Sequence, residues 1–155
     1  MTKIPITIGI IGHRDAILTK DHFSKLEKVF DDLHIKYPKS PIVLFSQLAE
    51  GADTAVADFF LNLKEKIGRA YSLVVPLPFN LKDYRGRFPK SELSKFDSLL
   101  KKSDRYFVIN NDDKIPVNDL YRQGGQFVAD NSLICLLYTS PSPRDATLSR
   151  MPSSA

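Results

Sequence analysis

The chain has 155 residues, of which 43% are hydrophobic and 26% are charged, and this composition is typical of one globular domain. Its net charge of +4 comes from lysines and arginines scattered along the chain. A nucleic-acid surface needs a dense basic stripe, so nucleic acid is not expected as a partner. One cysteine excludes an internal disulfide framework, and three histidines far apart in sequence give no metal site, so no metal or other cofactor is expected.

The N-terminal residues contain no long apolar run of the kind that marks a signal peptide. No stretch approaches the roughly 18 consecutive apolar residues of a membrane-spanning helix. We therefore expect a cytoplasmic protein that does not associate with a membrane through this chain.

The N-terminal part of the chain predicts a strand, a helix and a second strand. Residues 4–11 form a β-branched run that is typical of a buried strand and ends in a turn at residues 12–15. Thr19 can cap the following helix, whose apolar residues recur at helical spacing. Prolines end this helix, and residues 42–46 form the next strand.

The second helix has the clearest pattern in the chain. Seven apolar residues recur at helical spacing from Ala52 to Ile67, and Gly68 stands where a left-handed C-terminal cap is expected. A third strand follows over Tyr71–Leu77, and residues 79–88 are polar and indicate a turn-like connection.

The remaining pattern predicts two more helices and two more strands. Ser91 opens a helix, residues 106–109 form a strand, Asn118 can cap a fourth helix, and a fifth apolar run starts at Leu133. Five strands that alternate with four helices predict an α/β protein, a three-layer Rossmann-like sandwich with a mostly parallel sheet.

Residues 136–155 differ in character from the rest of the chain, because serines and prolines follow a strand that has just begun. This stretch resembles a translated sequencing-adaptor read-through. We therefore expect an incomplete Rossmann-like domain over residues 1–135 and a non-native or disordered tail over residues 136–155. No function is assigned to the tail.

Two turns contain candidate ligand-binding residues. A small-residue turn before a helix leaves unpaired N–H groups and a partial positive charge, which suit a phosphate or a carboxylate. If the first two strands are neighbours, both turns face one cleft at the carboxyl edge of the sheet. The candidates are Gly12, His13 and Arg14 in the first turn, and Ser46, Glu50, Gly51, Ala52 and Asp53 in the second.

Each candidate residue has a chemical role and a structural alternative. The planar guanidinium of Arg14 matches a phosphate, and Gly12 and Gly51 would let a ligand approach the backbone closely. Asp53 could accept a hydrogen bond from a sugar hydroxyl or cap its helix. His13 could donate to a phosphate or base, or pack beside the turn.

Tyr84, Arg85 and Arg87 follow the third strand and could close over a bound nucleotide, or they could form an exposed loop. The glycines at positions 9 and 12 do not form the dinucleotide-binding fingerprint, and the chain contains no phosphate-loop motif. No spacing supports a Ser/His/Asp or Cys/His catalytic group.

Three segments together resemble the SLOG superfamily of Rossmann-like domains. They are IGIIGHRD at residues 8–15, LFSQLAEGAD at residues 44–53 and VVPLP at residues 74–78. The superfamily includes DprA, the LOG cytokinin-activating enzymes, and YpsA-like and molybdenum-cofactor-carrier-like proteins. YRQGGQFV at residues 121–128 resembles the penultimate helix of a bacterial branch that has the same two turns.

The resemblance implies a nucleotide or nucleotide-derived ligand at the ends of the strands, bound by the candidates above together with Tyr84. It implies a binding or sensing module, which could form a homo-oligomer or be fused to an effector domain. The alternative is a nucleoside 5′-monophosphate phosphoribohydrolase that cleaves the N-glycosidic bond, for which Glu50 and Asp53 are the candidate carboxylates. The sequence departs from the family at Arg87, where the branch has an acidic residue, and it lacks the Gly-Gly-Thr-type turn.

Overall fold

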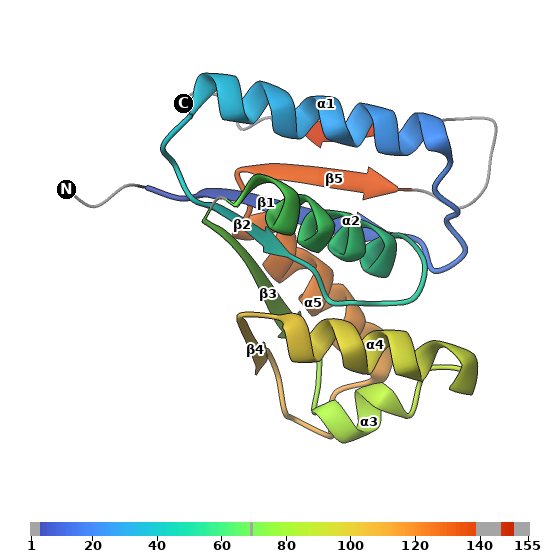
Figure 1. The fold of residues 1–155 in the computed structure, drawn as a ribbon. Coiled ribbons are helices and arrows are strands. Elements are labelled where there is room, and N and C mark those ends of the chain that lie inside the picture. The colour runs from blue at the N-terminus through green and yellow to red at the C-terminus, as the bar shows by residue number, and fades with distance from the viewer. Residues whose placement is uncertain (1–3, 69, 139–146, 151–155) are drawn as a thin grey trace.

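The computed structural model describes residues 4–68, 70–138 and 147–150 (Figure 1). The strands are Ile6–Gly12 (β1), Ile42–Phe45 (β2), Tyr71–Leu77 (β3), Arg105–Val108 (β4), Ile134–Tyr138 (β5) and Thr147–Arg150 (β6). The helices are Lys20–Lys36 (α1), Ala52–Ile67 (α2), Leu81–Arg85 (α3), Lys90–Lys102 (α4) and Val117–Asp130 (α5). No described helix has both the length and the apolar character needed to cross a membrane.

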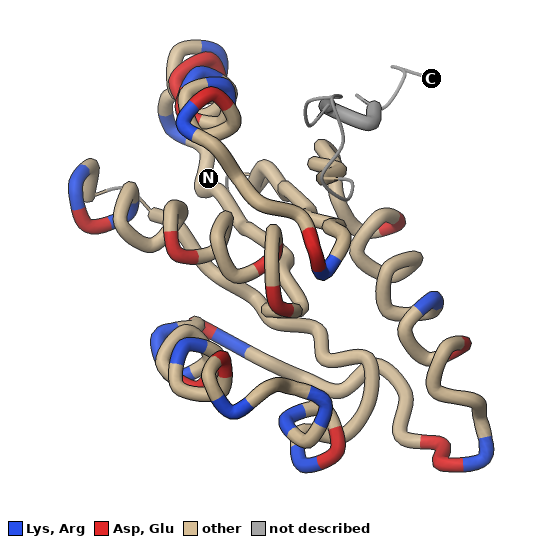
Figure 2. The backbone as a smooth tube through the Cα atoms, turned by 90° about the vertical axis from the view of Figure 1, so that its right-hand side faces the viewer, with Lys and Arg blue, Asp and Glu red and all other residues tan. Residues whose placement is uncertain are grey.

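The strands form one sheet in the order β4-β3-β2-β1-β5-β6. Strands β1 to β5 are parallel, and β6 pairs antiparallel with β5. Helices α1, α2 and α4 cover one face of the sheet and α5 covers the other (Figures 1 and 2). Right-handed crossovers produce this arrangement, because the chain moves outward from β1 to β4 and then returns to place β5 beside β1. The structure confirms the predicted three-layer, Rossmann-like α/β fold with a mostly parallel sheet.

An aromatic cluster attaches α1 and α2 to the sheet. Phe60 stacks on Tyr71 with the ring centroids 4.8 Å apart, and Phe30 lies 5.7 Å from Phe60. Both phenylalanines are fully buried. Burying a large apolar side chain contributes about 1.5–3 kcal/mol, so this cluster fixes the two helices on their face of the sheet.

The predicted caps of the first two helices are confirmed. The hydroxyl of Thr19 accepts a hydrogen bond from the His22 N–H, and His22 Nδ1 accepts one from the Thr19 N–H at 2.9 Å. Gly68 ends α2 with φ of 68°, in the left-handed region.

The prediction of a turn-like segment at residues 79–88 was wrong, because this segment contains α3. The side chain of Asn80 caps the helix by accepting a hydrogen bond from the Asp83 N–H at 2.9 Å. Tyr84 then turns inward and is buried. Five helical residues are too few for a periodic apolar pattern to be visible in the sequence.

Two helix starts also differ from the prediction. Pro89 precedes α4 and Pro116 precedes α5, whereas Ser91 was expected to open the first of these helices and Asn118 to cap the second. Proline suits a helix start because its φ is fixed near the helical value and its missing N–H would have no partner there.

The boundaries of the first and fifth strands also differ from the prediction. Strand β1 starts at Ile6, and Ile4 is exposed, so the first strand is shorter than predicted. Strand β5 continues past residue 135 to Tyr138, which pairs with Gly12 of β1. Apart from β6, residues 139–155 lie outside the described residues, and the predicted origin of the tail stays a prediction.

Candidate functional site

The two predicted turns lie side by side at the carboxyl edge of the sheet, because β1 pairs in parallel with β2. A Cβ atom on Gly12 would lie 2.4 Å from the Cβ of Ala52, and a Cβ atom on Gly51 would lie 2.4 Å from the carbonyl oxygen of Arg14. The space beside both glycines is therefore filled by the neighbouring turn. The glycines let the two turns pack together, and this corrects the expectation that they leave room for a ligand.

The second turn has a strained backbone and an internal hydrogen-bond network. Leu48 is fully buried at φ of 54°, a conformation that costs a non-glycine residue about 1–3 kcal/mol. The Ser46 hydroxyl accepts a hydrogen bond from the Leu48 N–H at 3.1 Å and donates one to the carbonyl oxygen of Asp53 at 3.2 Å. Ser46 was predicted to contact a ligand, but its hydroxyl is used inside the turn.

Asp53 lies in the first turn of α2 and is 4% exposed. Burial raises the pKa of its carboxyl from 3.8 to about 7, and hydrogen bonds from the backbone of Ala49, Gln47 and Gly12 only partly offset this rise. Its Oδ1 atom has no hydrogen-bond partner among the described residues. Asp53 is thus a buried carboxyl that titrates near neutral pH, between the two turns.

A space of about 20 Å³ opens above these turns, and we call it the small hollow. Such a volume holds about one water molecule. Arg14 Nε lies 3.9 Å from Glu50 Oε1 at its rim, and the hydroxyl of Tyr121 is buried without a partner among the described residues. The lining residues are Arg14, Ala49, Glu50, Tyr84, Arg87, Phe88 and Tyr121.

Tyr84 forms a wall of the small hollow, and its hydroxyl points away from solvent. The hydroxyl donates a hydrogen bond to the carbonyl oxygen of Gln47 at 2.9 Å. Burial raises the pKa of Tyr84 well above its usual value of 10.0, and the nearby Asp53 adds to this rise. Through this hydrogen bond to Gln47, Tyr84 stabilises the second turn.

An open depression of about 650 Å³ continues from the small hollow past the start of α2, and we call it the wide hollow. Arg14 and Glu50 line both of these spaces, and Gly51 lines only the wide hollow. The rest of its wall comes from residues 15–17, Thr54 and the start of α4.

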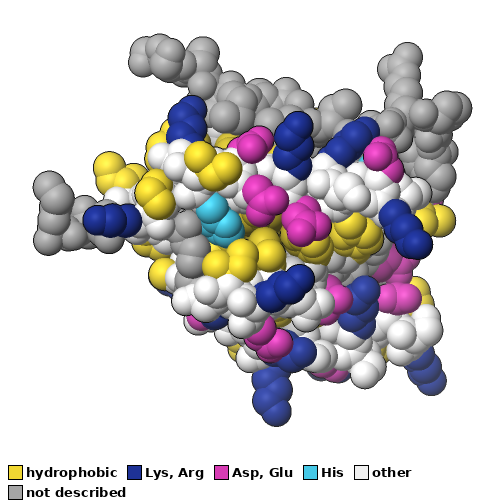
Figure 3. Space-filling view, turned by 45° about the horizontal axis from the view of Figure 1, so that its top comes forward, with side chains coloured by type: hydrophobic (Ala, Val, Ile, Leu, Met, Phe, Trp, Pro, Cys, Tyr) yellow, Lys and Arg dark blue, Asp and Glu magenta, His cyan; other side chains and the backbone are white. Residues whose placement is uncertain are grey.

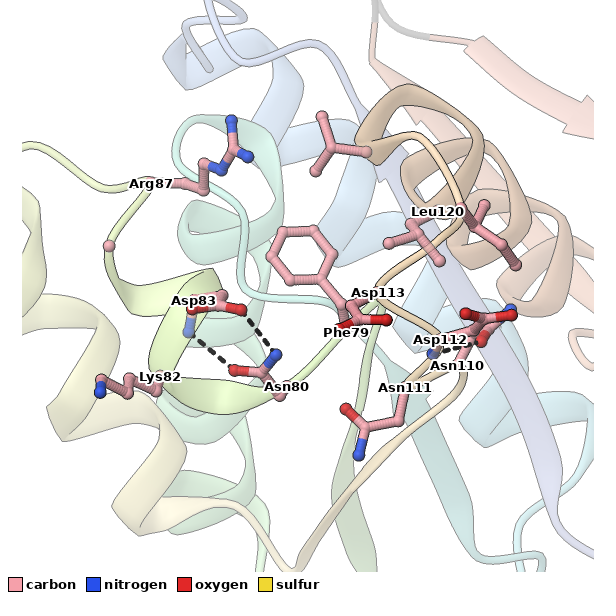
Figure 4. A pocket seen from close by; sticks show the side chains of 13 residues that line it. Phe79, Asn80, Lys82, Asp83, Arg87, Asn110, Asn111, Asp112, Asp113 and Leu120 are labelled. Carbon is pink, nitrogen blue, oxygen red and sulfur yellow. Dashed lines mark hydrogen bonds between the residues drawn. The ribbon is translucent and has the colours of Figure 1, made fainter.

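A third space, of about 480 Å³, was not predicted from the sequence, and we call it the polar cavity (Figure 4). It lies between the segment that contains α3 and the loop that joins β4 to α5. Its lining residues are Phe79, Asn80, Lys82, Asp83, Gly86, Arg87, Asn110, Asn111, Asp112, Asp113, Ile115, Val117 and Leu120. Arg87 lines both this cavity and the small hollow.

Five of the predicted candidates line none of these three spaces: Gly12, His13, Ser46, Ala52 and Asp53. The ring of His13 is exposed, and its Nδ1 atom accepts a hydrogen bond from the Asp15 N–H at 3.2 Å. Ala52 is fully buried against Gly12. The structure therefore brings together Arg14, Glu50 and Tyr84 around the small hollow.

Acidic and basic side chains are interspersed on the face of the molecule shown in Figure 3. Within the described part of the chain, no three His, Cys, Asp or Glu side chains are grouped so that they could hold a metal ion. The fold and the spaces at its carboxyl edge define a Rossmann-like α/β protein with a candidate small-molecule site. No protein-family model matches the chain, and a search of curated proteins found no match.

Proposed function

We propose that this chain binds a nucleotide or a nucleotide-derived ligand at the carboxyl edge of its sheet, as a binding or sensing module. The observation that carries this proposal is the series of three spaces at that edge, connected by shared arginines. Arg87 joins the polar cavity to the small hollow, and Arg14 joins the small hollow to the wide hollow. Ligands of doubly wound α/β proteins bind outside the carboxyl ends of the strands.

Both arginines are available to a phosphate. The side chain of Arg87 is exposed and makes no ion pair or hydrogen bond among the described residues. The contact of Arg14 with Glu50 is long, at 3.9 Å, and the Arg14 side chain is 56% exposed. An exposed ion pair of this kind contributes at most about 1 kcal/mol, so a phosphate can displace Glu50 from Arg14 at little cost.

We expect Arg14→Ala to weaken nucleotide binding by roughly 1.5–3 kcal/mol, the range for a hydrogen bond to a charged group. Isothermal titration calorimetry of the full chain with a panel of nucleotides measures this change. Arg105→Ala is the matched control, because Arg105 lies at the start of β4, at the opposite edge of the sheet. Equal nucleotide affinities for Arg14→Ala and the unmodified chain would contradict the assignment.

A second candidate function is hydrolysis of the N-glycosidic bond of a nucleoside 5′-monophosphate. The observation that favours it is the position of Glu50, whose carboxylate lines both the small and the wide hollow beside Arg14. A carboxylate beside the anomeric carbon stabilises the positive charge of the oxocarbenium-like transition state. Asp53 lines none of the three spaces, so Glu50 is the better candidate.

The enzyme hypothesis predicts that the chain releases free base from a nucleoside 5′-monophosphate and that Glu50→Gln abolishes this release. Chromatography of the reaction mixture measures the base directly. Nucleotide binding without any base release would support the binding module and exclude the enzyme.

A further inference from the structure

We infer that the polar cavity holds the base and ribose of a nucleoside 5′-monophosphate, whose phosphate lies outside the cavity at Arg87 and Arg14. This inference rests on the proposed function and specifies the class of ligand and its orientation. The cavity volume of about 480 Å³ lies within the range of roughly 300–1,000 Å³ that is typical of small-molecule sites.

The back of the cavity is apolar. Phe79 and Leu120 reach into it from the end of β3 and from α5 (Figure 4), and their exposed fractions are only 5% and 6%. Ile115 and Val117 extend this apolar surface. An apolar wall with an aromatic ring suits the flat face of a nucleobase.

The mouth of the cavity has polar groups that are free to bind a ligand. The Asn111 carboxamide and the Asp113 carboxylate make no hydrogen bonds among the described residues. Asn80, Asn110 and Asp112, in contrast, are hydrogen-bonded to nearby residues. Asn111 and Asp113 are therefore available to ribose hydroxyls or to N–H groups of a base.

The charges at the cavity orient the ligand. Three lining residues are acidic and two are basic, so a phosphate is disfavoured inside the cavity. Arg87 lines both the polar cavity and the small hollow, and Arg14 lines the small hollow as well. The small hollow of about 20 Å³ is too small for a phosphate, so the phosphate binds at its rim, between the two guanidinium groups.

Calorimetry on the full chain tests this orientation with the four ribonucleoside 5′-monophosphates, their nucleosides and inorganic phosphate. We expect at least one monophosphate to bind about tenfold or more tightly than both its own nucleoside and inorganic phosphate, because it fills the cavity and reaches the arginines. If every monophosphate binds no tighter than inorganic phosphate, the cavity holds no nucleoside and the inference is overturned.

Asn111→Ala separates this inference from the proposed function. We expect it to weaken binding of the monophosphate about tenfold and to leave binding of inorganic phosphate unchanged. The control is Asn118→Ala, since Asn118 is an exposed residue of the same region that does not line the cavity. Unchanged monophosphate binding in Asn111→Ala, with a loss in Arg14→Ala, overturns the cavity assignment alone. Absence of binding by every nucleotide overturns both proposals.

Discussion

Asp53→Asn is expected to remove most of the dependence of stability on pH between pH 4 and pH 8. Burial raises the pKa of Asp53 from 3.8 in an unperturbed chain to about 7 in the folded protein. The folded state therefore holds this proton more tightly than the unfolded state does. The free energy of unfolding is then highest below about pH 4, falls as the pH rises to about 7 and is constant above that. A pKa difference of about three corresponds to a loss of about 4 kcal/mol.

Urea denaturation at a series of pH values measures this effect. Comparing how the free energy of unfolding changes with pH in each protein removes any cost of the substitution that does not depend on pH. Asp58→Asn is the control, because Asp58 is an exposed residue of the same helix. We expect the unmodified chain and Asp58→Asn to lose stability in parallel as the pH rises, and Asp53→Asn to lose much less. Parallel profiles for all three proteins would show that Asp53 does not titrate in this range.

Gly51→Ala is expected to destabilise the protein by roughly 2–6 kcal/mol. Gly51 has φ of 94° and ψ of −126°, a combination that is essentially restricted to glycine and costs other residues about 1–3 kcal/mol. The new methyl group would also lie 2.4 Å from the carbonyl oxygen of Arg14, which belongs to the backbone and cannot rotate away. Forced overpacking of this kind adds about 1–3 kcal/mol.

Two other glycines separate the two causes. Gly68 also has a positive φ, of 68°, but a Cβ atom there meets nothing within 4 Å, so Gly68→Ala should cost only about 1–2 kcal/mol. Gly125 lies inside α5 with open space beside it, and Gly125→Ala should stabilise the protein by about 0.5–1 kcal/mol. In chemical denaturation, Gly125→Ala should be the most stable of the three variants, Gly68→Ala should come next and Gly51→Ala should be the least stable. A Gly51→Ala variant as stable as Gly68→Ala would contradict the close packing of the two turns.

The fold was largely predictable because its signals are local. The β-branched strands and the apolar spacing of α2 indicate their structures without tertiary information, and Gly68 marks the end of that helix. Helix α3 was missed because it depends on one Asn80 cap and on burial of Tyr84, which only the folded chain brings about.

The candidate site was predictable in part. The position of Arg14 and Glu50 at one edge follows from the pairing of two consecutive parallel strands. A glycine in a turn indicates that other atoms approach its backbone closely, but the sequence does not tell whether they belong to a ligand or to another turn. At Gly51 they belong to the backbone of Arg14. The polar cavity could not be predicted, because Phe79 and Asn111 come from segments that meet only when β3 and β4 pair.

The most direct test of the proposed site is a nuclear magnetic resonance titration of the isotopically labelled chain with a nucleoside 5′-monophosphate. Amide resonances report where the ligand binds, independently of any substitution. The proposed site predicts shifts that are largest at Arg14, Glu50, Arg87 and Asn111 and absent at Arg105, at the opposite edge of the sheet. A saturating ligand that shifts only residues at the opposite edge, or shifts none at all, would contradict it.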